Sequence, residues 1–178
     1  MPKILLICKS TTGFTRRYAD WIAAETGCHV IDFRAANPKT LAGFDTILFG
    51  SRLFAGKIDG LDKIRPMIAA SGARFILFAT GATPNAAEDI INAMWRTNLS
   101  PDELRTVPHF YMQAGMNFAK MPFIERMMMK LATLIMARKK EKTAEEQGFA
   151  DALSRSFDIT SPEYARPLID HIRNEVRS

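Results

Sequence analysis

The amino-acid sequence predicts an α/β fold: a five-stranded parallel sheet with helices on both faces and a helical insertion after the fifth strand. Short apolar runs alternate with segments whose apolar residues recur every three or four positions, which is the pattern of βαβ units. The runs are apolar throughout, as in strands buried on both faces of a parallel sheet. Roughly fifty residues separate the last strand from the last helix, too many for a simple connection.

The first half of the chain shows this alternation from its start. Residues 3–8 form an apolar run that ends at a cluster of Ser, Thr and Gly, and we expect the first strand there. From residue 14 the spacing is helical, and this predicted helix ends before Gly27. Residues 28–33 and 45–50 are the second and third predicted strands.

The second half continues the pattern and closes with a helix. The predicted helices span residues 61–70, 85–97 and 167–176, and the predicted fourth and fifth strands span residues 73–79 and 107–112. No internal repeat or composition shift divides the chain, so residues 1–178 are expected to form one domain with an insertion at about 115–160.

Composition excludes several classes of protein. The chain has 178 residues, 47% hydrophobic and 24% charged, which fits one ordinary globular domain. Cys8 and Cys28 form no CxxC pair and have no His at ligand spacing, so neither a disulfide framework nor a metal site is expected. With no signal peptide at the amino terminus, we expect a cytoplasmic protein.

The positive charge is concentrated in one segment. The formal net charge is +5, and residues 120–140 alone carry six Lys or Arg against one Glu. Phe123 is the single aromatic residue in this segment, so its basic residues are not interleaved with aromatics of the kind that stack on bases, and a nucleic-acid partner is not expected. Such a patch suits propionate groups, an acidic redox protein or anionic lipid.

The insertion is rich in methionine, with seven of the chain's ten methionines between Met112 and Met136. Its apolar residues from Ile124 to Ile135 fall on one helical face, and Arg138 begins a basic cluster at the end. Four interpretations stay open: a helix packed on the domain, a contact in a homo-oligomer, an adaptable wall for a flat apolar substrate, or a peripheral membrane contact.

The loop after the first strand has the composition of an anion site. Ser10-Thr11-Thr12-Gly13-Phe14-Thr15 contains four hydroxyls and one glycine directly before a helix. The first N–H groups of a helix lack partners, and the helix dipole favours a negative charge near them. The alternative interpretation is a helix cap with a tight glycine turn. The GxGxxG and GxxxxGK[ST] patterns are absent from the sequence.

The motif Ser10-x-Thr12-Gly13-x-Thr15 resembles the phosphate loop of flavodoxins, and the order of elements agrees with their fold. The similarity is closest to the flavodoxin-domain group that includes menaquinone-dependent protoporphyrinogen oxidase, through residues 50–57 and 109–115. The resemblance implies FMN as cofactor. It implies that Ser10, Thr11, Thr12, Gly13, Phe14 and Thr15 hold the phosphate, and that Ser51, Arg52, Leu53, Phe54, Ala55, Thr80, Gly81, Ala82 and Thr83 flank the isoalloxazine ring.

The sequence therefore predicts an FMN-binding redox protein for electron transfer or for an FMN-dependent oxidation resembling that of protoporphyrinogen oxidase. The resemblance implies a quinone or a tetrapyrrole as redox partner. No nucleophile–base pair is visible, so no catalytic residue is assigned. The alternative is a flavodoxin fold without flavin that acts as a binding or scaffold module.

Overall fold

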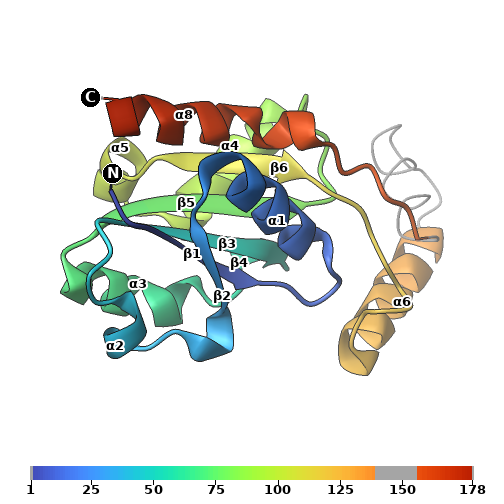
Figure 1. Cartoon of the computed structure of the whole chain (residues 1–178). Helices are drawn as coiled ribbons and strands as arrows, with labels where there is room; N and C mark the ends of the chain where they lie inside the picture. The colour runs from blue at the N-terminus through green and yellow to red at the C-terminus, as the bar shows by residue number, and fades with distance from the viewer. Residues whose placement is uncertain (1, 139–155, 178) are drawn as a thin grey trace. The chain divides into compact units, whose positions relative to one another are not determined.

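The computed structural model describes residues 2–138 and 156–177. The described residues fall into two compact units, one within residues 1–114 and 160–178 and the other within residues 115–159. The first unit is built on a sheet of five parallel strands (Figure 1). Their order is β2 (His29–Asp32), β1 (Ile4–Lys9), β3 (Thr46–Phe54), β5 (Arg74–Gly81) and β6 (His109–Gln113). This is the predicted fold class.

Helices cover both faces of this sheet. One apolar cluster joins α1 (Phe14–Thr26) and α8 (Arg166–Arg177) to one face, and these helices lie together in Figure 1. A second cluster joins α3 (Leu61–Ser71) and α4 (Glu88–Asn98) to the other face. The layers explain the apolar runs, because successive residues of a strand point to opposite faces and helices cover both faces.

Strand β1 illustrates the two-sided burial. Leu5 and Ile7 belong to the cluster under α3 and α4, whereas Leu6 and Cys8 belong to the cluster under α1 and α8. Burial raises the pKa of the Cys8 thiol to about 12. Cys8 is therefore a protonated core residue and not a reactive thiol.

Two central strands run further than the sequence predicted. Strand β3 continues to Phe54, four residues past the predicted end, and turns back into β4 (Lys57–Ile58) as an antiparallel hairpin. Strand β5 continues to Gly81. Gly50 lies inside β3 and does not end it. The absence of a side chain there leaves room for the Phe78 ring, since a Cβ on Gly50 would lie 1.9 Å from Phe78 Cζ.

Short helices replace parts of the chain that were predicted as connectors or as strand. They are the 3₁₀ turn η1 (Phe33–Ala35), α2 (Pro38–Leu41), α5 (Pro101–Thr106) and the 3₁₀ turn η2 (Pro162–Ala165). Asn37 and Ser100 begin α2 and α5 with capping boxes, each followed by Pro. Helix α5 occupies the chain before β6, which therefore begins at His109 and not at residue 107.

The second unit starts and ends with paired backbone. Met116 N donates to Phe157 O at 2.8 Å, and Phe157 N donates to Met116 O at 2.9 Å. A Cβ on Gly115 would lie 2.0 Å from Phe157 O, so only glycine fits there. Helix α6 (Phe123–Arg138) lies between these segments, after β6 as predicted. The basic residues 139 and 140 lie outside the described residues.

Tyr18 contacts the chain on both sides of residues 115–159, the segment that interrupts the sequence of the first unit. Its side chain is fully buried on α1, and its hydroxyl donates to the Gln113 carbonyl. The Ser161 N–H donates to the same hydroxyl oxygen at 3.3 Å. One side chain thus joins the chain before the second unit to the chain after it.

We predict that Gly50→Ala lowers the free energy of unfolding by about 1–3 kcal/mol or more, because the added methyl group overlaps the buried Phe78 ring. Urea denaturation measures the loss. The double variant Gly50→Ala with Phe78→Leu should be less destabilised than the sum of the two single variants. Additive effects would contradict a direct clash.

Candidate functional site

Strand register brings the predicted site segments to one edge of the sheet. Lys9 pairs with Ser51, and Arg52 pairs with Thr80 in the next strand. Gly81 pairs with Gln113 in β6. The carboxyl ends of β1, β3, β5 and β6 therefore lie side by side, where ligands bind in open α/β sheets.

The loop from Ser10 to Gly13 leads from β1 into an open helix start. Gly13 is the N-cap with a φ of 97°, a left-handed conformation that suits glycine, and its position lacks a side-chain cap. Ser10 Oγ accepts from Arg16 N at 3.2 Å. Thr11 is exposed and Thr12 is half-buried. The Ser10 hydroxyl thus accepts from one N–H group of the first turn. The N–H groups of Phe14 and Thr15 have no preceding helical turn to accept from them, so they suit an anion.

Two of the predicted site hydroxyls hold each other. The hydroxyls of Thr15 and Thr80 share a hydrogen bond of 2.8 Å, and each residue is 2% exposed. Phe14, also predicted as a phosphate contact, has its side chain in the core. The hydroxyl pair therefore ties the start of α1 to β5, and the Phe14 side chain packs in the core under α1.

A charged cluster lies at the ends of β1 and β3. Lys9 Nζ donates to Asp59 Oδ1 at 2.7 Å, and Arg52 Nε lies 3.6 Å from Asp59 Oδ2. Buried Ser51 donates its hydroxyl to the Asp59 carbonyl at 2.6 Å. Sequence reasoning missed Lys9 and Asp59 because fifty positions separate them. Asp59 offsets one of the two positive charges, so this cluster keeps a net positive charge at the edge of the sheet.

The predicted segment 51–55 is the end of a strand and the start of a turn, not a loop. Leu53 and Phe54 are half-buried, and the Arg52 guanidinium lies 5.1 Å from the centre of the Phe54 ring. Ala55 is exposed with a φ of 48°, the one non-glycine residue with positive φ among those the structure describes. The hairpin gives Phe54 a fixed place beside the edge.

Residues from β6 fix the segment from Thr80 to Thr83, of which Gly81, Ala82 and Thr83 are half-buried. The Tyr111 hydroxyl donates to the Thr83 carbonyl at 2.9 Å, and burial raises the pKa of Tyr111 to about 12. Asn85 N donates to Gln113 Oε1 at 3.1 Å. Tyr111 and Gln113 were not predicted as site residues; their place at the end of the last strand was the available signal.

An open pocket of about 200 Å³ lies beside this segment, lined by Asn85, Glu88, Ile91, Asn92 and Tyr111. No group of acidic, His and Cys side chains suited to a metal occurs in the described ranges. The edge combines hydroxyls and helix N–H groups that suit an anion with backbone next to half-buried apolar side chains. It suits a phosphate attached to a flat ring.

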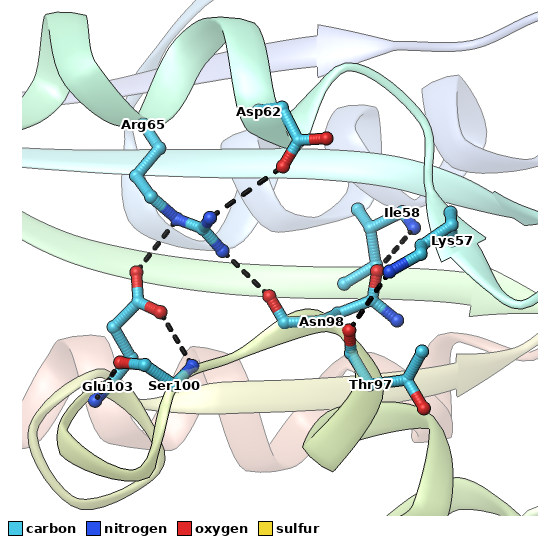
Figure 2. A network of polar contacts seen from close by, with 8 residues as sticks. All are labelled: Lys57, Ile58, Asp62, Arg65, Thr97, Asn98, Ser100 and Glu103. Carbon is cyan, nitrogen blue, oxygen red and sulfur yellow. Dashed lines mark hydrogen bonds and ion pairs between the residues drawn. The ribbon is translucent and has the colours of Figure 1, made fainter.

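A polar network connects the β3–β4 hairpin to the neighbouring helices (Figure 2). Asn98 accepts from Ile58 N at 2.9 Å. It also donates to the Gly56 carbonyl at 2.8 Å. Arg65 donates to the Asn98 carbonyl at 2.7 Å and pairs with Glu103 at 2.8 Å. The network joins α3, α4 and α5 to the turn that follows Phe54.

The parallel order 2-1-3-5-6, the hydroxyl loop after β1 and the hairpin after β3 define a flavodoxin-type α/β protein. A model of the flavodoxin domain family matches residues 5–145, and the chain belongs to that family. Family membership implies a flavin cofactor. The finer grouping with protoporphyrinogen oxidase is not part of this match.

The solved structures that resemble the chain are flavodoxins and other flavoproteins. A flavodoxin from the domain Archaea is 20% identical over 62% of this chain and 84% of that one, with a TM-score of 0.40. A WrbA-like flavodoxin from Agrobacterium tumefaciens is 16% identical over 71% and 88%, with a TM-score of 0.42. A candidate quinone reductase from Klebsiella pneumoniae is 11% identical over 86% of this chain and 82% of that one, with a TM-score of 0.43. No curated protein matches the chain.

We predict that Asn98→Ala lowers the free energy of unfolding by about 1–3 kcal/mol, because it leaves the Ile58 N–H and the Gly56 carbonyl without this partner. Hydrogen exchange of the Ile58 amide should become faster. Asn92→Ala, an exposed position on the same helix, is the matched control and should change neither quantity. Equal effects of the two variants would contradict the bracing role.

Proposed function

We propose that the protein binds FMN at the carboxyl edge of the sheet and acts as a redox protein. The observation that carries this proposal is the open start of α1 beside the hydroxyls of Ser10, Thr11 and Thr12. It lies at the same edge as residues 51–55 and 80–83, in a chain of the flavodoxin domain family.

The residues at the edge fit such a cofactor. The hydroxyls of Ser10, Thr11 and Thr12, with the N–H groups of the loop and of Phe14 and Thr15, would hold the phosphate. The ring would lie between the two segments 52–55 and 81–83. The buried hydroxyls of Thr15, Thr80 and Ser51 keep these segments in place.

FMN supplies reversible two-electron chemistry when it is bound, and the protein's part is orientation and electrostatics. The space that a Gly81 side chain would need is filled by Tyr111 and Leu53, since a Cβ there would lie 2.8 Å from the Tyr111 hydroxyl oxygen and 3.1 Å from Leu53 Cδ1. Tyr111 also fixes the backbone of this segment through the Thr83 carbonyl. The charges of Lys9, Arg52 and Asp59 would contribute to the electrostatic potential around the ring.

The first test compares FMN with riboflavin by calorimetry. FMN should bind more tightly, since hydrogen bonds to a charged acceptor contribute about 1.5–3 kcal/mol each. Thr12→Ala should weaken FMN binding about tenfold or more and leave riboflavin binding unchanged. Thr106→Ala, on α5 away from the edge, is the control. Equal affinities for FMN and riboflavin would overturn the phosphate site, and binding of neither would favour a flavin-free scaffold protein.

We further propose a redox pairing like that of protoporphyrinogen oxidase, with a tetrapyrrole as donor and a quinone as acceptor. The support is the resemblance of residues 50–57 and 109–115 to that group. In each transfer the porphyrinogen would lose an electron pair with its protons, and the quinone would take them up to become a quinol.

The pairing predicts that the FMN-loaded protein, mixed without oxygen with protoporphyrinogen and a short-chain menaquinone, forms fluorescent porphyrin and quinol together. The rate should exceed that of free FMN at the same concentration. The apoprotein is the second control. A rate no faster than free FMN, measured with protein that has bound its flavin, would exclude this pairing while leaving the FMN site intact.

A further inference from the structure

Helix α6 carries a large exposed apolar face. Eight large hydrophobic residues are exposed in the described parts of the chain, and six of them lie on this helix at 51–73% exposure. They are Phe123, Ile124, Met127, Met128, Leu131 and Leu134. Contiguous apolar patches of more than a few hundred Å² are rarely left bare in water, so this face indicates a partner surface.

The six side chains form one continuous stripe. At 100° per residue they fall within an arc of about 140° on the helix, which is wider than the narrow seam of a coiled coil. Exposed Lys130 lies about 20° beyond one edge of this arc, and exposed Lys120 lies in the turn before the helix. A broad apolar stripe with cations at its margin is the pattern of a helix that lies in a membrane interface.

Charge favours an anionic lipid surface over a second copy of the chain. Residues 115–138 carry Lys120, Arg126, Lys130 and Arg138 against Glu125, a net charge of +3 (four minus one). Two such faces packed together would bring like charges close, whereas an anionic bilayer offers apolar depth and negative headgroups at the same place.

The helix is suited to lie on a bilayer and not to span it. None of the helices in the described parts of the chain combines the length and apolar character that a bilayer crossing requires. Arg126 donates to the Met121 carbonyl at 3.0 Å, which ties the preceding turn to the helix. The face is therefore presented by a formed helix, and less ordering is needed on binding.

We propose that the apolar face of α6 docks on an anionic lipid bilayer, with its methionine, leucine and phenylalanine side chains in the interfacial region and Lys120 and Lys130 at the level of the phosphates. Methionine side chains suit contact with lipid because they are flexible and adapt to irregular apolar surroundings. This inference does not depend on flavin binding.

The test is sedimentation of the full-length protein with vesicles of mixed phosphatidylglycerol and phosphatidylcholine. The double variant Met128→Glu with Leu131→Glu should bind at least about tenfold more weakly, because each side chain loses its apolar burial. Ile90→Glu is the matched control: Ile90 is 58% exposed on α4, and its replacement should leave binding unchanged. Lys120→Glu with Lys130→Glu should also weaken binding, and added salt should reduce the wild-type affinity.

Three results would overturn the proposal: equal binding of wild type and the α6 double variant, equal loss in Ile90→Glu, or no binding of wild type to vesicles at all. Analytical ultracentrifugation of the same samples identifies the competing occupant. A wild-type dimer that Met128→Glu with Leu131→Glu converts to a monomer, without vesicle binding, would assign the face to a second copy. An unchanged thermal midpoint ensures that each variant is folded.

Discussion

The double-sided burial of β1, β3 and β5 is the constraint on which the rest of the molecule depends. Strands that are apolar on both faces need a helical layer on each side, and α1 with α8 and α3 with α4 supply these layers. Parallel neighbours then require right-handed crossovers. Because every crossover leaves from a carboxyl end, the loops that can hold a ligand gather at one edge. The Gly50–Phe78 contact shows how tightly the layers close.

The polar groups at that edge divide into two kinds. Thr15, Ser51 and Thr80 are buried and use their hydroxyls to join one element to another. Ser10, Thr11 and Thr12 lie nearer to solvent and begin an open helix. The buried group makes the edge rigid, and a rigid edge lowers the ordering cost when a ligand binds. The same residue type therefore serves structure where it is buried and stays available for a ligand where it lies nearer to solvent.

The sequence was sufficient for the strands, the main helices and the place of the hydroxyl loop, because apolar periodicity reports burial directly. It was insufficient for strand ends, because Gly50 and Ser51 look like a strand terminus. In the structure β3 pairs with β1 as far as Ser51 and with β5 as far as Arg52, and its last two residues pair with β4. Contacts between distant positions, such as Lys9 with Asp59 and Tyr111 with Thr83, depend on the fold and have no local signal. The capping box at Ser100 was a local signal for α5 that the prediction did not use.

The clamp formed by Tyr18 has an evolutionary consequence. It fastens Gln113 and Ser161, the two ends of the interruption, to α1 within the first unit. The paired backbone of Met116 and Phe157 repeats this closure at the base of the second unit. Because both ends of this segment are fixed, the entropic cost of closing it grows only slowly with its length. Genetic drift can therefore lengthen, shorten or replace that segment while the sheet keeps its stability, so new surfaces can be acquired without rebuilding the redox fold.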